Sequence, residues 1–355
     1  MDSKERRFIT ALKNKMKNIG FVSLNSGGTM GHMSLLTNLA NKILKKTEHK
    51  CFIFSEYDYA KSSSLKNNNL EFVKIKKQEH SKTIAGCFKY KYKQEFLDII
   101  KTKKIDILIF STFFDKKLVE EARKIVQKVF LISYPLRDTH REAFFVKNLY
   151  ELFDKVFTLK DIVDLLRIYP NETLALPPNL DFKFNNKYKR SNKILITCGG
   201  GGRPSSEIFF NIIKENIKDI LERYPELEFT IIKGNSNFNF NSDRVKIIEW
   251  SNNFIELVKE SDFIISESGY FTIMELLALN KPALVIPGAR RIDNQELRAV
   301  RFEGLGKGFF MLPEQDNNDF FIIFDKIKNF KVSETNVIRK LSEVKLESLI
   351  FKELI

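Results

Sequence analysis

The feature that most constrains the fold is the alternation of short apolar runs with longer amphipathic segments along the 355 residues. Continuous apolar runs separated by segments of helical length are typical of parallel strands that are buried on both faces. The pattern therefore predicts an α/β protein with doubly wound parallel sheets. In the first half, strands are expected at 19–24, 51–54, 70–75, 105–110, 129–133 and 156–159, and helices at 35–46, 94–102 and 116–127.

A polar stretch from Pro170 to Asn192 interrupts this pattern and is rich in Lys and Asn, which predicts an interdomain linker. The alternation then restarts, with strands expected at 194–197, 229–233, 245–250, 263–266 and 283–286 and helices at 205–223, 254–260, 271–279 and 294–302. We therefore predict two Rossmann-like domains that face each other across a cleft. Their expected bounds are 1–175 and 193–333, with a linker at 176–192 and a C-terminal helix at 334–355.

Composition narrows the class of protein. No run approaches the roughly 20 apolar residues of a membrane-spanning helix, and the N-terminus lacks the apolar core of a secretory signal. Three scattered cysteines without CxxC spacing predict a reduced, cytoplasmic protein without a zinc site. The net charge of +14 is compatible with anionic partners, among them a membrane surface on which the chain would lie peripherally, and equally with a general abundance of Lys, Asn, Ile and Phe that has no functional meaning. Nucleic acid is not expected, because the lysines are spread along the chain and no nucleic-acid motif is visible.

The first candidate site is a glycine-bearing turn after the first predicted strand, formed by Gly27, Gly28, Thr29 and Gly31 just before His32. Glycines let a backbone approach an anion, and a helix N-terminus supplies free N–H groups, although many Rossmann folds need such a turn only for its tightness. His32 is expected at the edge of the sheet where such folds bind ligands. Its side chain is therefore a candidate general base, with a cap or surface histidine as the alternative.

The second predicted domain opens in the same way, with four consecutive glycines at 199–202 followed by Arg203. Four glycines in a row are conformationally expensive unless something must come close to the backbone. Two such turns facing each other across a cleft suit a ligand with a diphosphate in its middle. Arg203 is a weaker candidate for neutralising that diphosphate.

The segment 262–275 carries the strongest pattern in the chain. A buried strand ends at a Ser/Gly loop that opens a helix, so Ser268, Gly269 and Thr272 are candidates for phosphate binding. Glu275 follows on that helix and can reach back towards a ribose attached to the same phosphate. The alternative, a solvated helix charge, fits poorly because the surrounding helix is apolar. Gln295 suits sugar hydroxyls, because its amide both donates and accepts hydrogen bonds.

These residues resemble the nucleotide-binding domain of GT-B-fold glycosyltransferases, above all the MurG-type enzymes and the related diacylglycerol glucosyltransferases. The segments that carry the resemblance are 262–275, Pro287 with 293–295, and 250–254, which is similar to the segment whose backbone reads uracil. The turn at 27–32 resembles the GGTGGH loop of that family. Met30 replaces one of its glycines, and the proline that usually follows the histidine is absent, so a peptidoglycan acceptor is not implied.

The resemblance implies a GT-B fold and transfer of a hexose or N-acetylhexosamine from a nucleotide-sugar. The family favours a UDP-sugar as the donor, and it leaves the acceptor open, with lipid-linked acceptors among the candidates. It implies a metal-independent inverting displacement without a cofactor, and His32 as the base. The residues implied in donor binding are Gly200, Gly201, Arg203, Trp250, Phe254, Ser268, Gly269, Thr272, Glu275, Asn294 and Gln295.

Two further segments are candidates for acceptor and membrane contact. The loop 133–141, with Arg137 and His140, is expected to overhang the cleft and bind the acceptor, unless it is merely solvated. The segment 88–93 alternates aromatic and basic residues, which predicts membrane contact or an amphipathic edge strand. Two other functions stay open: a nucleotide-sugar epimerase or hydrolase on the same scaffold, and a non-catalytic nucleotide-sugar-binding subunit.

Overall fold

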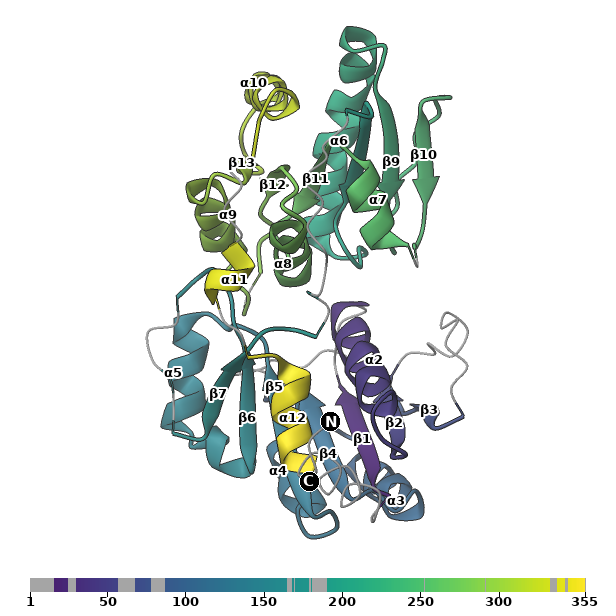
Figure 1. Cartoon of the computed structure of the whole chain (residues 1–355), viewed down its shortest axis with the longest axis vertical. Helices are drawn as coiled ribbons and strands as arrows, with labels where there is room; N and C mark the ends of the chain where they lie inside the picture. Colours follow the sequence, from purple (N-terminus) through teal and green to yellow (C-terminus); the bar gives the residue numbers. More distant parts are fainter. Residues whose placement is uncertain are drawn as a thin grey trace, which may run out of the picture.

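The protein is described from a computed structural model that covers residues 16–24, 30–56, 68–77, 87–164, 168, 170–178, 180, 190–251, 253–290, 292–332, 337–341 and 344–354. Within these residues the chain forms two α/β units, one built on each predicted half (Figure 1). The doubly wound parallel architecture expected from the sequence is confirmed. The predicted site residues Gly27, Gly28 and Thr29 lie outside the described residues.

The N-terminal sheet is parallel throughout, and its described strands run in the order β3-β2-β1-β4-β5-β6-β7. These strands are β1 (Asn18–Ser23), β2 (Lys50–Ser55), β3 (Leu70–Lys74), β4 (Ile107–Ser111), β5 (Lys128–Ser133), β6 (Lys155–Leu159) and β7 (Glu172–Ala175). The crossovers contain α2 (Met30–Leu44), α3 (Lys93–Thr102), α4 (Lys116–Ala122), α5 (Asp138–Val146) and the short 3-10 helix η1 (Leu149–Leu152). Its central strands are buried on both faces, as their unbroken apolar runs require.

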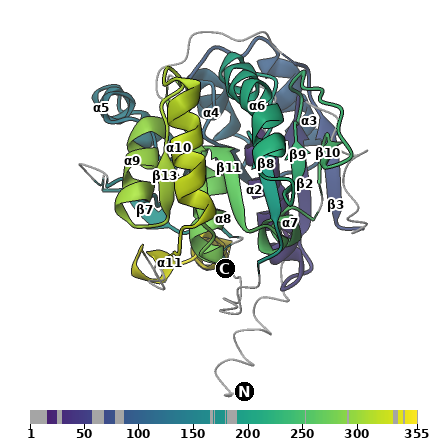
Figure 2. The ribbon, with the colours of Figure 1, turned by 90° about the horizontal axis from the view of Figure 1, so that it is seen from above.

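The C-terminal sheet is also parallel, with the described order β10-β9-β8-β11-β12-β13. Its strands are β8 (Lys193–Thr197), β9 (Glu228–Ile232), β10 (Val245–Ile248), β11 (Phe263–Glu267), β12 (Ala283–Ile286) and β13 (Gly308–Phe310). The helices are α6 (Pro204–Arg223), α7 (Phe254–Glu260), α8 (Tyr270–Leu279), α9 (Gln295–Gly304) and α10 (Asn317–Lys328). Figure 2 shows α6 and α10 on one side of this sheet and α7 and α8 on the other.

The end of the chain returns to the N-terminal unit. Instead of one predicted helix at 334–355, the structure has α11 (Val337–Leu341) and α12 (Leu346–Leu354). The two are separated where Lys345 forms a β-bridge with Leu176. Helix α12 lies beside the N-terminal sheet (Figure 1), where Glu347 forms an ion pair with Lys42 of α2 at 2.8 Å. The C-terminal segment therefore ties the two halves of the chain together.

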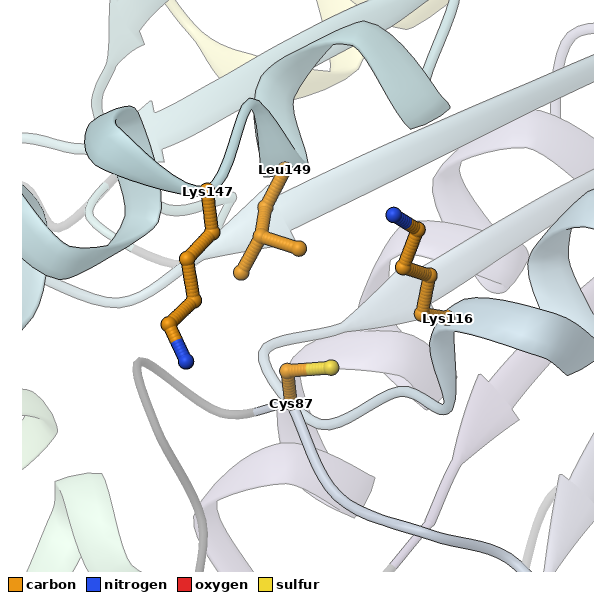
Figure 3. A pocket seen from close by; sticks show the side chains of 4 residues that line it. All are labelled: Cys87, Lys116, Lys147 and Leu149. Atoms are coloured by element: carbon orange, nitrogen blue, oxygen red, sulfur yellow. The ribbon is translucent and has the colours of Figure 1, made fainter.

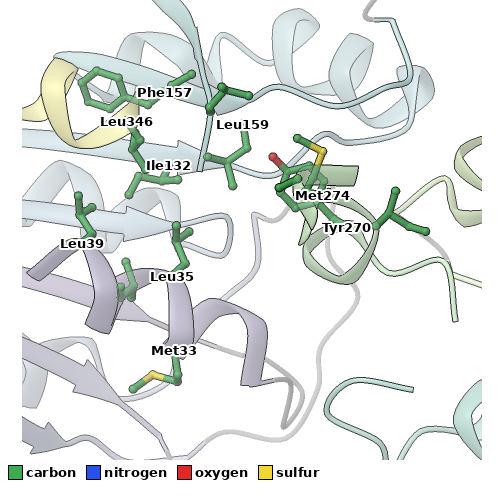
Figure 4. Packing of buried hydrophobic residues seen from close by; sticks show 14 of the residues in the cluster. Met33, Leu35, Leu39, Ile132, Phe157, Leu159, Tyr270, Met274 and Leu346 are labelled. Atoms are coloured by element: carbon green, nitrogen blue, oxygen red, sulfur yellow. The ribbon is translucent and has the colours of Figure 1, made fainter. Parts of the chain in front are cut away.

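One core cluster contains residues of both units. Leu35 and Leu39 of α2 and Ile132 of β5 belong to the same buried cluster as Tyr270 and Met274 of α8 (Figure 4). Burying apolar surface is the main favourable term in folding, so this shared cluster favours contact between the units. It also fixes the start of α8 against the N-terminal unit.

Two predicted irregular segments contain regular structure. Strand β7 lies inside the stretch 170–192 that was expected to be a linker, and α5 begins within the loop predicted at 133–141. The reason is a buried ion pair: Glu172 of β7 accepts two hydrogen bonds from Arg141 of α5, at 2.8 and 2.9 Å. Glu172 and Arg141 therefore lie in the interior and pair with each other, although their polarity had suggested solvated segments. Strand β13 and helix α10 had no sequence prediction.

The aromatic residues of the segment 88–93 point inward. Phe88 and Tyr90 are buried, and the Tyr90 hydroxyl donates to the Lys76 carbonyl at 2.9 Å, whereas Lys89 and Lys91 are exposed. Phe88 and Tyr90 therefore complete the core and do not offer their rings to a membrane, and residues 88–92 do not belong to any described strand, so the edge-strand alternative is wrong. Membrane contact through Lys89 and Lys91 stays a prediction. Among the described residues, the helices are too short or too polar to cross a membrane.

Candidate functional site

The C-terminal edges of the two sheets carry most of the predicted site residues, and contacts between the units bring these edges together. The Tyr134 ring, after β5, lies 5.8 Å from that of Tyr270 and 5.3 Å from that of Phe271, both centroid to centroid. A Cβ atom placed on Gly31 would lie 3.2 Å from the Phe271 ring. The first turn of α2 therefore faces the first turn of α8 across the boundary.

His32 is buried in the first turn of α2. Its Nδ1 lies 2.9 Å from the Ser111 hydroxyl, and its ring stacks on Tyr134 with centroids 4.3 Å apart. Burial, with a smaller contribution from the positive charge of Arg203, lowers the pKa of His32 to about 3. The imidazole is therefore neutral at physiological pH. The tautomer that donates from Nδ1 to Ser111 leaves the lone pair of Nε2 available to accept a proton.

Arg203, which follows the second glycine-bearing turn, contributes positive charge to the surroundings of His32. Contacts within the protein explain why glycines occupy that turn. Gly201 has φ +62°, and a Cβ atom on it would lie 2.5 Å from the Lys233 carbonyl oxygen. The Gly202 amide donates to the Ser236 hydroxyl at 2.9 Å, and the Gly200 carbonyl accepts from Asn235 at 3.1 Å. What approaches this backbone closely is the loop after β9, so the glycine run is not by itself evidence for an anion.

The loop before α8 is locked to the loop before α9. Ser268 is fully buried, and its hydroxyl donates to the Gln295 carbonyl at 2.8 Å. The Gln295 side-chain oxygen in turn accepts from the Gly288 amide at 2.8 Å. Ser268 and Gln295, which were both predicted to contact a ligand, therefore hold the two loops in place. At Gly269, by contrast, a Cβ atom would meet nothing within 4 Å, and the neighbouring Thr272 is partly exposed. That part of the loop has room for a ligand.

Glu275 lies on α8 and is partly buried. It makes no hydrogen bond or ion pair within the part of the chain that the structure describes. Burial raises the pKa of its carboxyl to about 8, because the charged form loses hydration that no partner replaces. At neutral pH the group is therefore largely protonated and can both donate and accept a hydrogen bond.

The remaining predicted residues differ in their exposure. Trp250 is 40% exposed, Phe254 begins α7 and packs against the core, and Asn294 caps α9. Arg137 contacts the other unit: its Nε donates to the Asp293 carbonyl at 3.0 Å and its backbone amide to the Ile292 carbonyl at 3.0 Å. In this structure Arg137 therefore joins the two units.

His140, the other residue predicted at this loop, is partly exposed and lies in the first turn of α5, beside Thr139. Its place in a helix leaves the side chain accessible from the solvent.

The buried ion pair between Asp161, which follows β6, and Arg298 of α9 was not predicted from the sequence. Arg298 has no exposed surface, and its guanidinium contacts both Asp161 oxygens, the shortest distance being 2.8 Å. The same side chain donates to the Ser268 carbonyl at 2.9 Å and to Asp293 at 2.7 Å. One guanidinium thus joins the N-terminal unit to both loops of the candidate donor site. Its partner is 137 positions away, which no local pattern reveals.

Each unit also contains a pocket. The N-terminal pocket has a volume of about 440 Å³ and is lined by Cys87, Lys116, Lys147 and Leu149 (Figure 3). The C-terminal pocket has a volume of about 380 Å³ and lies where β11 and β12 end, between α6 and the start of α9. Only the second pocket adjoins the predicted donor residues, since it includes Ser205 and Glu296.

Comparison with known proteins matches residues 193–334 to the glycosyltransferase family 28 C-terminal domain. A Clostridium botulinum UDP-N-acetylglucosamine–N-acetylmuramyl-(pentapeptide) pyrophosphoryl-undecaprenol N-acetylglucosamine transferase is 32% identical over 168 residues, 45% of either chain. The chain thus spans about half the length of this relative. The enzyme of the same description from Clostridium botulinum Alaska E43 is 26% identical over 91% of this chain and 93% of its own.

Among solved structures, Acinetobacter baumannii MurG is similar over 95% of this chain and 99% of its own, with a TM-score of 0.62 and 13% identity. At that identity the likeness shows the fold alone. The GT-B fold expected from the sequence is confirmed. The C-terminal unit is therefore a glycosyltransferase family 28 C-terminal domain, on a chain with the GT-B fold and distant similarity to MurG enzymes.

Proposed function

We propose that the chain transfers a hexose or N-acetylhexosamine from a UDP-sugar to a hydroxyl-bearing acceptor, without a metal ion and with inversion at the anomeric carbon. The observation that carries the proposal is that the first turn of α2, which holds the buried His32, faces the first turn of α8 across the boundary of the two units, with a Cβ atom on Gly31 3.2 Å from the Phe271 ring. A neutral imidazole on one wall and a helix N-terminus on the other suit removal of a proton from an acceptor and stabilisation of a leaving diphosphate.

The donor would lie on the C-terminal wall. The free space at Gly269 leaves room for phosphate oxygens at the start of α8, where backbone N–H groups and the helix dipole favour negative charge. Glu275 would hold the ribose, since its protonated carboxyl can hydrogen-bond to both vicinal hydroxyls. We assign the uracil to Trp250 and Phe254 on the similarity to the MurG segment.

The reaction would begin with attack of the acceptor oxygen on the anomeric carbon. The bond from that carbon to the diphosphate oxygen breaks, and UDP leaves with the electron pair. The acceptor hydroxyl gives its proton to Nε2 of His32, while Arg203 and the N-termini of α6 and α8 stabilise the leaving charge. The negative diphosphate would oppose the effect of Arg203 and raise the pKa of His32 towards the range of an effective base.

The test is release of UDP from UDP-glucose and UDP-N-acetylglucosamine, measured with and without a lipid extract as the acceptor pool, in buffer containing EDTA. The proposal predicts release that depends on the acceptor and persists in EDTA. His32→Ala should lower it about a hundredfold or more, because a positioned base contributes at least that much. Ser34→Ala, a change at an exposed position of the same helix, is the matched control.

Three outcomes would count against the proposal. Release of UDP or of an epimerised UDP-sugar without any acceptor would favour the hydrolase or epimerase alternative. Binding of UDP-sugar without turnover in any acceptor pool would favour a non-catalytic subunit. Full activity in His32→Ala would remove the base from its assigned role.

A further inference from the structure

The hydroxyl of Tyr134 is a buried polar group that the proposed reaction does not use. Tyr134 directly follows β5, and its Oη atom is buried and has no hydrogen-bond partner among the described residues. Two other tyrosines of the chain show the usual arrangement. The Tyr90 hydroxyl donates to the Lys76 carbonyl at 2.9 Å, and the Tyr270 hydroxyl donates to the Lys160 carbonyl at 2.8 Å. Because leaving a buried hydroxyl unsatisfied is costly, the exception at Tyr134 indicates a hydrogen bond that is made to a ligand.

Tyr134 lies directly against the proposed base. Its ring and that of His32 are stacked, with centroids 4.3 Å apart and planes within 6° of parallel. Both residues are anchored at the end of β4: His32 Nδ1 lies 2.9 Å from the Ser111 hydroxyl, and the Tyr134 amide donates to the Thr112 hydroxyl at 3.2 Å. Because these anchors hold Nδ1 of one ring and the backbone of the other, the opposite ends, His32 Nε2 and Tyr134 Oη, lie away from β4. Two polar atoms on stacked rings can contact neighbouring atoms of one ligand.

The space beside this hydroxyl is kept open by a glycine. A Cβ atom placed on Gly31 would lie 3.6 Å from Tyr134 Oη and 3.2 Å from the Phe271 ring. A side chain at position 31 would therefore occupy the place where a partner of the hydroxyl has to lie. Gly31 and Phe271 are both partly exposed, so a ligand that enters between the first turns of α2 and α8 can reach this place.

The chemistry of the hydroxyl narrows what it can bind. Burial raises the pKa of Tyr134 well above its usual value, and the nearby Tyr270 and Asp293 raise it further. The group therefore keeps its proton and can donate a hydrogen bond to an oxygen. That oxygen is not the attacking one, because an oxygen that accepts a hydrogen bond is a weaker nucleophile. It is also not expected on the UDP group, whose proposed contacts all come from the C-terminal unit.

We propose that Tyr134 contacts the acceptor and that its hydroxyl donates a hydrogen bond to an oxygen next to the hydroxyl that His32 deprotonates. The inference rests on the proposed function, because it presupposes an acceptor at His32. It adds the chemical class of that acceptor, which carries a second oxygen beside the reacting hydroxyl, as sugars and glycerol derivatives do. Tyr134 is then a specificity-determining residue on the acceptor side and contributes nothing to the binding of UDP.

The experiment compares the full chain with Tyr134→Phe, which keeps the stacked ring and removes only the hydroxyl. UDP release is measured against increasing amounts of a lipid extract at saturating UDP-glucose or UDP-N-acetylglucosamine. The variant should lower kcat/KM for the extract by about tenfold and leave the calorimetric affinity for UDP within about twofold of the wild type. Its midpoint of urea unfolding should be equal or higher, because a buried unsatisfied hydroxyl is removed. Tyr92→Phe, a change at a partly exposed tyrosine just before α3, is the matched control.

The outcomes separate this inference from the function on which it rests. Wild-type kcat/KM in Tyr134→Phe, or a loss that UDP affinity shares equally, would overturn the acceptor contact while leaving a transferase. A lowered urea midpoint with unchanged activity would show that the hydroxyl serves stability alone. If Tyr134→Phe does not fold, Gly31→Ala decides, because its methyl group fills the space beside the hydroxyl, and wild-type kcat/KM in that variant would overturn the inference. Wild-type protein that releases no UDP with the extract would overturn the proposed function itself.

Discussion

The two walls of the site differ in how their polar groups are used. On the N-terminal wall, two polar side chains are engaged: His32 contacts Ser111, and Arg137 contacts a carbonyl of the other unit. On the C-terminal wall, Glu275 is partly buried and makes no hydrogen bond or ion pair in the described part of the chain. The C-terminal unit is thus prepared to bind a polar ligand, whereas the N-terminal unit presents a base and aromatic rings.

The pockets of the two units differ in the same way. The N-terminal pocket has Lys116 and Lys147 in its lining, whereas three glutamates line the C-terminal pocket. Cations favour anionic groups, and carboxylates favour hydroxyl or amino groups. The two units are therefore not interchangeable halves of one binding site.

The largest effect is expected from breaking the ion pair between the units. Arg298→Gln leaves Asp161 buried without its charged partner, which should lower the free energy of unfolding by about 3–5 kcal/mol. Urea denaturation measures this value, and Arg301→Gln, an exposed change on the same helix, is the control. The double variant Asp161→Asn, Arg298→Gln should recover part of the loss, because position 161 then carries no buried unpaired charge, and the carboxylate of Asp293 that also loses its partner is 28% exposed. A loss below about 1 kcal/mol in the single variant would show that the units do not depend on this pair.

A smaller effect concerns the carboxyl of Glu275. Its pKa is about 8 in the folded protein and near 4.5 when unfolded, so the folded state binds the proton more tightly between these values. Stability from this group is therefore present at low pH and is lost as the pH rises through 8. The shift, discounted by about half because the side chain is only partly buried, corresponds to about 2 kcal/mol.

Urea denaturation at pH 5 and pH 9 tests this expectation. Wild type should lose about 2 kcal/mol more than Glu275→Gln between the two values, because the amide does not titrate. Glu256→Gln, an exposed change on α7, should behave like the wild type. Identical pH dependence of wild type and Glu275→Gln would mean that Glu275 is solvated in the folded protein.

The sequence predicts the donor wall better than the acceptor wall for a physical reason. The helix expected at 254–260 matches α7 at both ends, and the strand–loop–helix unit around Gly269 lies where it was expected, because these features depend on local patterns. The contacts of Arg298 and Arg141 depend on partners that are distant in the chain. From the sequence alone, a buried charged or polar side chain cannot be told from a solvated one, because its partner is not known. Strand β7, which holds Glu172, and the inward-facing ring of Tyr90 were not predicted for that reason.

Calorimetric titration of UDP into wild type and Glu275→Ala at pH 7 tests whether the C-terminal wall binds a nucleotide through Glu275. We expect measurable binding to the wild type and a loss of affinity of at least about tenfold in the variant, the value of one or two hydrogen bonds to ribose. Wild-type affinity retained in Glu275→Ala would contradict the ribose assignment, and no binding of UDP to the wild type would contradict the donor site itself.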